Sequence, residues 1–265
     1  MLARLIHFRG LLLTLTAREL KARYRGSLLG FLWSLVNPLL LLAVYTLVFD
    51  VVFKNRAGGA QPYAVFLLSG LFPWIWFSGS LLDGTVSLSA NAGLLRKAVF
   101  PAEVLPIVAT LASLAHYLLA MPVLLVALAV ARFGLHHPVG GWSILLLPAA
   151  VLVQLPFTAG LALALAALNV HFKDVRDLLA NLLTLAFFLT PILYPLETVA
   201  RVRPLALLVA ANPVTPFVRL YQELLFFGRV PGPGLWLQAV GLALVAWAIG
   251  SWIFERLSQT LVEAV

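Results

Sequence analysis

The chain has 265 residues, of which 62% are hydrophobic and 11% are charged, with a formal net charge of +8 and no cysteine. This composition excludes a soluble globular domain, a disordered chain, a disulfide framework and a thiolate metal site, and it predicts an integral membrane protein. The basic residues lie beside apolar runs, so membrane topology and anionic lipid explain the positive charge better than nucleic acid does.

The first predicted element is a basic amphipathic helix at about residues 14–30. At about 100° per residue, Lys21 and Arg25 fall within about 60° of Arg18, while leucine and alanine side chains share the opposite side. A helix with one basic and one apolar face lies flat at the headgroup level of a membrane. The sequence therefore predicts an interfacial helix near the start of the chain.

This basic helix is expected to run without a linker into the first apolar segment. Glu19 stands four residues before Arg23, which is the favourable order for an ion pair along a helix. Gly26 and Gly30 have the GxxxG spacing that allows two helices to approach closely, either within one protomer or across a dimer.

Six apolar stretches follow, each near the length of about 20 residues that crosses a bilayer. Helices satisfy their own backbone hydrogen bonds in lipid, and the alternation typical of a membrane β-barrel is absent from the sequence. We therefore predict an all-α integral membrane protein with a single domain over residues 1–265. The expected spans lie at about 31–53, 63–82, 104–131, 142–168, 178–196 and 230–254.

Lysine and arginine are unequally distributed between the two sets of connecting segments. The richer set comprises residues 4–25, Arg96 and Lys97, Lys173 and Arg176, and Arg256, whereas the short loops opposite hold Lys54, Arg56 and Arg132. The positive-inside rule places both termini in the cytosol. Further arginines on the outer side weaken this count without reversing it, and they require their own explanation: Arg201, Arg203, Arg219 and Arg229.

The segment at about 197–229 has an irregular character. Its apolar part, residues 204–218, is too short to cross the bilayer and is interrupted by Asn212-Pro213 and Thr215-Pro216. We interpret it as a re-entrant or interfacial helical pair, because irregular backbone at membrane depth is tolerated where it is buried in protein or lines a cavity. The alternative is a seventh span, which would place the C-terminus outside.

The sequence contains no P-loop, since the only glycine pair at that spacing, Gly79 and Gly84, is followed by Thr85. The chain is therefore not expected to hydrolyse ATP. His116 stands alone as an ionisable group in the middle of a span, so we interpret it as a packed neutral residue rather than a proton relay.

Other chemistry is also poorly supported. His136-His137-Pro138 is typical of a turn rather than a metal site, and we expect no metal and no cofactor bound by this chain. Asp174 and Asp177 stand beside basic residues in a short loop, which disfavours an enzyme acting on prenyl-linked sugars. A secondary transporter is disfavoured because internal repeats and coupling residues are lacking.

Two further features each have two interpretations. The loop at 91–106 contains Arg96 and Lys97 close in sequence to Phe100. It is interpreted either as an orientation signal followed by a turn or as a docking surface for a soluble partner. Aromatic residues gather near the middle of the second span. They are interpreted either as residues that pack the helices together or as a pore wall whose flat ring faces contact sugar C–H groups. The aromatic set is Phe72, Trp74, Trp76 and Phe77, and Trp33 and Asn37 in the first span have the same two interpretations.

In their order and spacing, five segments resemble the permease subunits of ABC type-2 exporters, particularly the branch that exports O-antigen, capsular polysaccharide or teichoic acid. They are RELKARYRGSLLGFLWSLVNP (18–38), YAVFLLSGLFPWIWFSGSL (63–81), NAGLLRKAVFPAEVLP (91–106), HFKDVRDLL (171–179), and TPILYP followed by NP (190–195, 212–213). The resemblance covers nearly the whole chain.

The resemblance implies a homodimer in the bacterial inner membrane that binds two copies of a separate P-loop ATPase, where MgATP is held. Its cargo would be a lipid-linked glycan; the alternative is a drug, a peptide or a simple lipid. The ATPase-coupling residues would be Leu94, Leu95, Arg96, Lys97, Phe100 and Glu103, and the substrate-entry residues Arg18, Lys21, Arg23 and Arg25. The candidate pathway-lining residues are Trp33, Asn37, Trp74, Trp76, Phe77, Phe187, Phe188, Tyr194, Phe217 and Tyr221.

Overall fold

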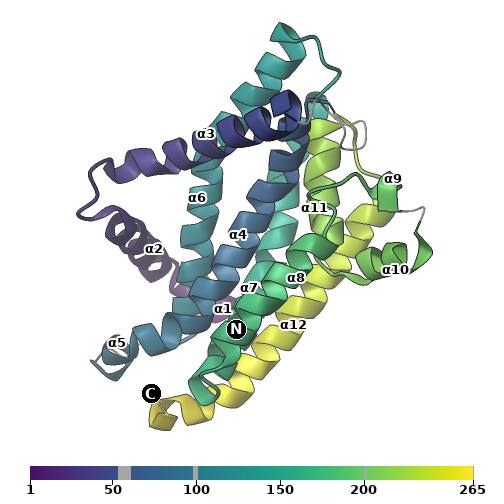
Figure 1. Ribbon diagram of the computed structural model, residues 1–265. Helices are drawn as coiled ribbons and strands as arrows, with labels where there is room; N and C mark the ends of the chain where they lie inside the picture. The colour runs from purple at the N-terminus through teal and green to yellow at the C-terminus, as the bar shows by residue number, and fades with distance from the viewer. Residues whose placement is uncertain (53–60, 98–100, 200–201, 265) are drawn as a thin grey trace.

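The computed structural model describes residues 1–52, 61–97, 101–199 and 202–264, and this part of the chain is helical (Figure 1). The helices are α1 (Leu2–His7), α2 (Arg9–Tyr24), α3 (Trp33–Tyr45), α4 (Tyr63–Ala90), α5 (Ala92–Lys97), α6 (Val104–Ala129), α7 (Leu147–His171), α8 (Val175–Leu189), α9 (Leu196–Val199), α10 (Arg203–Ala211), α11 (Thr215–Tyr221) and α12 (Pro233–Ala264). Short π-helical turns extend α3, α6 and α11, and a 3₁₀ turn leads into α7.

Within the described residues, four helices are long and apolar enough to cross a membrane. They cover Tyr63–Ala90, Val104–Gly134, Trp142–His171 and Pro233–Leu257. The prediction of an all-helical membrane protein is therefore confirmed. The other two expected spans coincide with shorter helices, the apolar helix Trp33–Phe49 and α8. Helix α8 ends at Leu189, just before the two prolines of residues 190–195 interrupt the chain.

The prediction of a continuous helix from the basic segment into the first span is wrong. Helix α2 begins at Arg9, earlier than expected, and ends at Tyr24, well before α3 begins at Trp33. Gly26 and Gly30 lie between them with φ of 79° and 50°, a conformation that glycine adopts without steric cost. These glycines turn the chain, and a Cβ on either would meet nothing within 4 Å, so in this chain they do not form a close helix contact.

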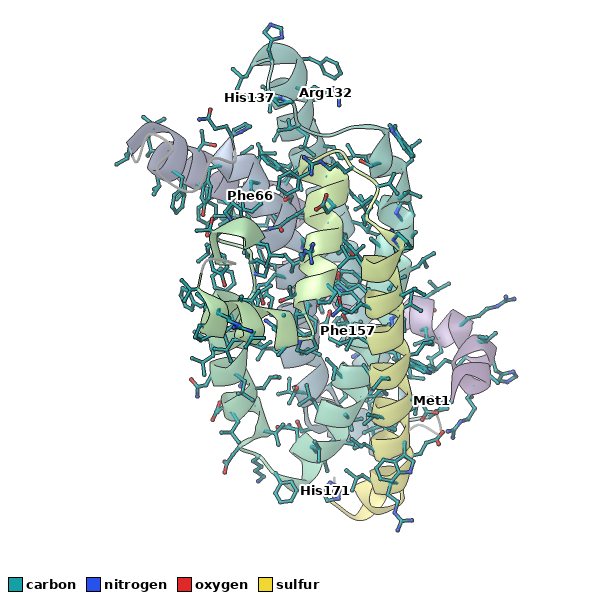
Figure 2. The ribbon with its side chains drawn as sticks, turned by 90° about the vertical axis from the view of Figure 1, so that its right-hand side faces the viewer. Met1, Phe66, Arg132, His137, Phe157 and His171 are labelled. Atoms are coloured by element: carbon teal, nitrogen blue, oxygen red, sulfur yellow. The ribbon has the colours of Figure 1, made fainter. Side chains whose placement is uncertain are left out.

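Helix α4 lies at the centre of the bundle, with α6 and α7 packed along it (Figure 1). Most of α4 is buried, which explains why its sequence is apolar on all sides. Helix α12 packs along the whole of α7, and α2 and α3 diverge from the bundle, with α2 against α6 and α3 against α6 and α4. Figure 2 places His137 and Arg132 at one end of the bundle, called the upper end, and His171 at the lower end.

The predicted re-entrant segment forms α10 and α11, which are separated at Asn212-Pro213. Side-chain hydrogen bonds hold this segment: Asn212 Nδ2 donates to Thr190 Oγ1 at 2.8 Å, and Thr215 Oγ1 donates to the Val209 carbonyl at 2.7 Å. Gln222 Nε2 donates to the Pro191 carbonyl at 2.7 Å. The bonds of Asn212 and Gln222 connect this segment to the turn after α8, and the bond of Thr215 connects α11 to α10. The bonds to the Val209 and Pro191 carbonyls satisfy backbone acceptors, as is required of non-helical backbone inside an apolar environment.

Candidate functional site

Five of the six predicted coupling residues lie at the lower end of the bundle, four on α5 and one just before α6. Leu94 and Leu95 on α5 are partly buried against an apolar cluster that includes Leu88 and Val104. Arg96 and Lys97 end α5, but their side chains and the whole of Phe100 lie outside the described residues. Glu103 precedes α6 and is 5% exposed.

An ion-pair cluster ties Glu103 to both ends of the chain. Arg4 Nε lies 3.3 Å from Glu103 Oε1, and Arg4 Nη2 lies 2.8 Å from Glu255 Oε1 near the end of α12. The Met1 amino group lies 3.5 Å from the same Glu255 oxygen. Sequence reasoning missed this cluster of Met1, Arg4, Glu103 and Glu255, because its members are far apart in the chain and no local pattern connects them.

We expect Arg4→Gln to destabilise the chain more than Glu103→Gln does. Glu103 Oε1 has no hydrogen-bond partner among the described residues, so removing Arg4 takes away the charge partner of this buried oxygen. Removing Glu103 leaves a half-exposed arginine that keeps Glu255. Allowing for solvent screening of Arg4, we expect a cost of about 1–3 kcal/mol for Arg4→Gln and less for Glu103→Gln. Thermal unfolding midpoints of the purified variants in nanodiscs measure the order, and the reverse order would contradict this account of the cluster.

The four predicted entry residues lie on and just after α2, on the side of α4 and α6 (Figure 1). Arg23 pairs with Asp83 of α4 at 2.5 Å rather than with Glu19, so the expected ion pair along the helix is wrong. Arg18 lines a small cleft of about 150 Å³ with Asp83 and Leu94. Lys21 and Arg25 are exposed. The basic helix is thus connected to α4 and approaches α5.

A cavity of about 460 Å³ lies between α3, α4 and α6, with Arg23 on its wall; we call it the α3–α4–α6 cavity. It brings together three predicted pathway residues, Trp33, Asn37 and Trp76, with residues of α6 that sequence reasoning did not select as lining: Ser113, His116, Tyr117 and Ala120. Trp76 Nε1 and Ser113 Oγ are buried and have no hydrogen-bond partner among the described residues. Two buried donors beside a cavity are suited to a ligand that carries hydroxyl or carbonyl groups.

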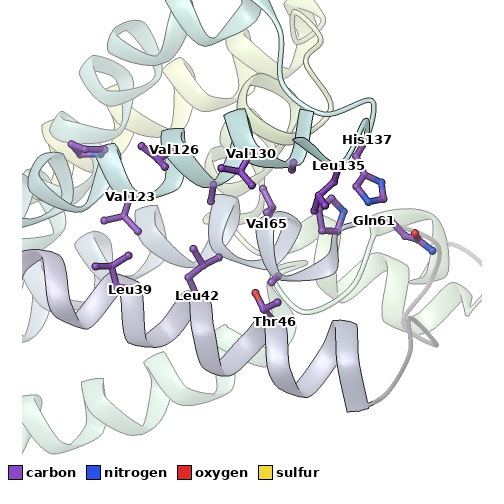
Figure 3. A pocket seen from close by; sticks show the side chains of 15 residues that line it. Leu39, Leu42, Thr46, Gln61, Val65, Val123, Val126, Val130, Leu135 and His137 are labelled. Atoms are coloured by element: carbon purple, nitrogen blue, oxygen red, sulfur yellow. The ribbon is translucent and has the colours of Figure 1, made fainter. Parts of the chain in front are cut away.

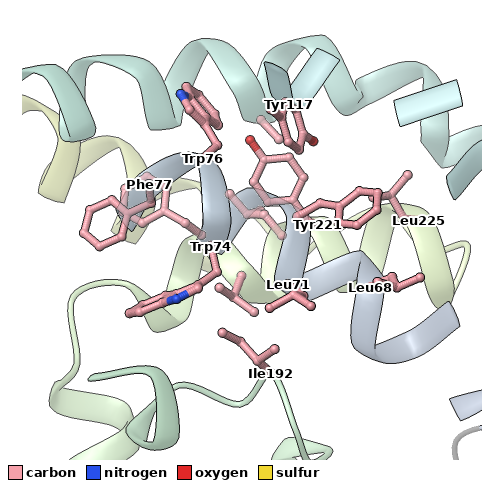
Figure 4. Packing of buried hydrophobic residues seen from close by; sticks show 14 of the residues in the cluster. Leu68, Leu71, Trp74, Trp76, Phe77, Tyr117, Ile192, Tyr221 and Leu225 are labelled. Atoms are coloured by element: carbon pink, nitrogen blue, oxygen red, sulfur yellow. The ribbon is translucent and has the colours of Figure 1, made fainter. Parts of the chain in front are cut away.

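Four of the other predicted pathway aromatics are buried in a cluster around α4, and Phe187 packs against it (Figure 4). The four are Trp74, Phe77, Phe217 and Tyr221. Phe77 stacks on Phe157 at 5.6 Å between ring centroids, and Phe157 stacks on Phe217 at 4.4 Å. The Trp74 ring lies 5.6 Å from Phe77 and 5.8 Å from Phe187. Within a single chain these rings therefore pack against one another, and offset or tilted ring pairs stabilise such a core.

Three of the aromatic candidates differ in their surroundings. Tyr221 is buried against Tyr117, with 6.0 Å between ring centroids. Phe188 is 58% exposed, and the Tyr194 hydroxyl donates to the Phe188 carbonyl at 2.8 Å. Phe188 is thus a side chain that an isolated chain presents to its surroundings, whereas Tyr221 is part of the core.

A larger cleft of about 680 Å³ separates α3 from α6 toward the upper end (Figure 3). Its walls are aliphatic, with Leu39 and Leu42 facing Val123, Val126 and Val130. Polar groups enter it at the edge near Gln61 and His137. The cleft therefore suits an apolar chain or a helix rather than a charged ligand.

Comparison with known proteins connects these features to a family. A family model described as ABC-2 type transporter matches residues 10–226. The chain is 41% identical over 264 residues to the O-antigen export system permease protein RfbA of Myxococcus xanthus, covering 98% of this chain and 97% of that protein. It is 33% identical over 255 residues to a protein of the same description from Klebsiella pneumoniae, covering 96% and 94%. It is 26% identical over 217 residues to the polysialic acid transport protein KpsM of Escherichia coli, covering 80% of each.

Proposed function

The chain belongs to the ABC-2 type transporter family, and on that premise we propose that it is the permease subunit of an ATP-driven exporter that moves a lipid-linked polysaccharide across the bacterial inner membrane. The observation that carries the proposal is similarity from end to end to an O-antigen export permease. The helical bundle, with its cavities and its basic helix α2, is consistent with transport rather than with catalysis.

Energy for transport would come from a partner. The sequence lacks a P-loop, so a separate ATPase subunit that binds MgATP is required. We propose that α5 and Glu103 form the surface on which this ATPase docks, and that two permease chains pair and bind two ATPase copies. Since the Met1, Arg4, Glu103 and Glu255 cluster connects the end of this loop to α12, movement there would reach the last long helix directly.

We further propose six membrane crossings, a re-entrant pair formed by α10 and α11, and both termini in the cytosol. Helix α3 and its extension together cover Trp33–Val52, near the length of a span. The 15 residues of α8 are short for a span, and local thinning of the bilayer or oligomerisation accommodates short segments. His171 lies at the lower end, as do α5 and the C-terminus of α12, opposite His137 at the upper end (Figures 1 and 2). This arrangement supports a cytosolic lower end.

The α3–α4–α6 cavity is the proposed contact site for the cargo. Aromatic faces of Trp33, Trp76 and Tyr117 suit the C–H faces of a sugar, and Asn37 and Ser113 suit its hydroxyl groups. Arg23 at its wall pairs with Asp83, so this pair is neutral overall. Arg18 and Lys21 on α2 and Arg25 just after it are exposed cations that suit an anionic carrier-lipid headgroup.

One observation favours a second candidate function. The cleft between α3 and α6 is larger and almost wholly apolar, as export of a drug, a peptide or a simple lipid would require. Deletion of the gene distinguishes the two candidates. We expect loss of surface polysaccharide and accumulation of lipid-linked glycan on the cytosolic side, both restored by the intact chain. Normal surface polysaccharide together with lost tolerance of a hydrophobic compound would instead support the second candidate.

A further inference from the structure

A fourth cavity, of about 380 Å³, lies between α11 and the start of α12. Its polar lining consists of Arg219 on α11, Glu223 one turn later, Arg229 in the following loop and Gln238 on α12. Gly232 and Gly234 complete one wall, and a Cβ on either glycine would meet nothing within 4 Å. We call this space the arginine cavity. It contains two of the arginines whose position on the outer side the topology leaves unexplained.

Within the part of the chain that the structure describes, neither guanidinium is paired with a carboxylate. Among the described residues, no ion pair within 4.0 Å involves Arg219 or Arg229, although Glu223 shares the cavity. Three other arginines are engaged, Arg4 and Arg23 in ion pairs and Arg132 with the Gly140 carbonyl at 2.6 Å. The guanidinium carbon of Arg229 lies 5.5 Å from the centroid of the Phe227 ring, a cation–π contact that engages the face of the guanidinium and leaves the N–H groups at its edge available to an anion.

The loop that carries Arg229 is held in place at the upper end of the bundle. The Gly140 amide donates to the Phe226 carbonyl at 2.9 Å, and the Arg229 amide donates to the Glu223 carbonyl at 2.9 Å. Gly228 has a φ of 64° and lies so close to Gly140 that a Cβ would collide with the Gly140 carbonyl. Arg219 and Arg229 are therefore presented to one space by elements with a fixed separation.

We propose that the arginine cavity binds a phosphate-bearing anion. Two forked guanidinium groups from different elements bracket a polyanion better than a single charge, and arginine forms paired hydrogen bonds with phosphate oxygens. The cavity carries two positive groups and one carboxylate, and the N-terminus of α12 adds further positive potential. The phosphate can come from the headgroup of an anionic membrane lipid or from a soluble or glycan-linked diphosphate.

Replacement of Glu223 provides a second test of the proposal, because its expected effect on anion binding is opposite to that of replacing the arginines. Its carboxylate competes with an incoming anion for the same guanidinium groups, so removing its charge should strengthen anion binding. A residue that only maintains the fold would weaken binding when it is replaced. Glu223→Gln is therefore expected to tighten binding several-fold, whereas Arg219→Gln and Arg229→Gln each weaken it roughly ten-fold or more.

The experiment uses the full chain in nanodiscs of neutral phosphatidylcholine and measures the ligand-induced shift of the thermal unfolding midpoint. One arm replaces part of the lipid with phosphatidylglycerol, and the other adds inorganic pyrophosphate, with sodium acetate at equal ionic strength as the control for screening. Arg203→Gln is the matched variant, since Arg203 is an exposed arginine at the start of α10 that does not line the cavity.

We expect at least one arm to raise the midpoint of the native chain and of Arg203→Gln, and to leave the Arg219→Gln, Arg229→Gln double variant unmoved. A shift with phosphatidylglycerol alone identifies a lipid headgroup, and a shift with pyrophosphate identifies a diphosphate. No shift in either arm, an equal shift in the double variant, or weaker binding by Glu223→Gln would overturn the proposal. The assay measures binding and involves no transport. A negative result would therefore reject the anion site without rejecting the proposed export function, and loss of the export function would not reject the anion site.

Discussion

Replacing Gly250 or Gly160 by alanine is expected to prevent stable folding of the chain. The two glycines lie where α12 crosses α7, and each allows the backbone of one helix to touch that of the other. A Cβ on Gly250 would collide with the Gly160 carbonyl, and a Cβ on Gly160 would collide with the backbone of Ala246 and Trp247. The obstacle is backbone rather than a flexible side chain, so the helices themselves must separate. We expect a loss of at least about 3 kcal/mol.

The measurement is the yield of monodisperse chain after extraction from the membrane, together with its thermal unfolding midpoint. Gly241→Ala is the matched control, because Gly241 lies on the same helix and a Cβ there meets nothing within 4 Å. We expect this control to be neutral or slightly stabilised, since alanine has the higher helix propensity. Native yield and midpoint for both Gly250→Ala and Gly160→Ala would contradict the described packing of α7 on α12.

Reversing the charge of both Arg96 and Lys97 is expected to abolish export while the chain still reaches the membrane. Both residues end α5, whose leucines Leu94 and Leu95 pack against the bundle, so the far side of this short helix is the side that we propose for docking of the ATPase. Charge reversal turns attraction into repulsion at a docking surface, and we expect the affinity for the ATPase to fall roughly ten-fold or more.

Retention of the ATPase during purification and the amount of surface polysaccharide measure this effect. Arg9→Glu is the control, because Arg9 is an exposed cation at the start of α2, a different element from α5. Retention of the ATPase and normal export by the Arg96→Glu, Lys97→Glu variant would exclude α5 as the docking element. Loss of the same properties in Arg9→Glu would point to a general effect of charge instead.

The sequence predicts the helices well where apolar length decides the outcome. Helices α4, α6, α7 and α12 begin within a few residues of the expected spans, because long apolar runs leave few alternatives in lipid. It predicts the boundary between α2 and α3 poorly. Gly26 and Gly30 fit the spacing of a helix contact, yet their positive φ values form a turn, and only the backbone conformation separates these two uses of glycine.

The candidate site was predictable in part. Trp33, Asn37 and Trp76 were selected from composition within two different spans, and they line one cavity because α3 and α4 approach each other there. Contacts between distant segments were not predictable from local patterns. The ion pairs of Arg4 with Glu103 and Glu255, and the backbone contact of Gly160 with Gly250, depend on how helices far apart in the chain are brought together.

The central claim is that this chain exports a lipid-linked glycan by using ATP hydrolysed by a partner. The most direct test reconstitutes the purified chain and its P-loop ATPase in liposomes that contain the lipid-linked glycan, and detects glycan on the opposite side with a membrane-impermeant lectin. We predict that the lectin signal rises with ATP, stays at background with a non-hydrolysable analogue, and disappears with an ATPase-inactive partner. A lectin signal that is independent of ATP would contradict this function. So would a complex that hydrolyses ATP and moves a hydrophobic compound but no glycan.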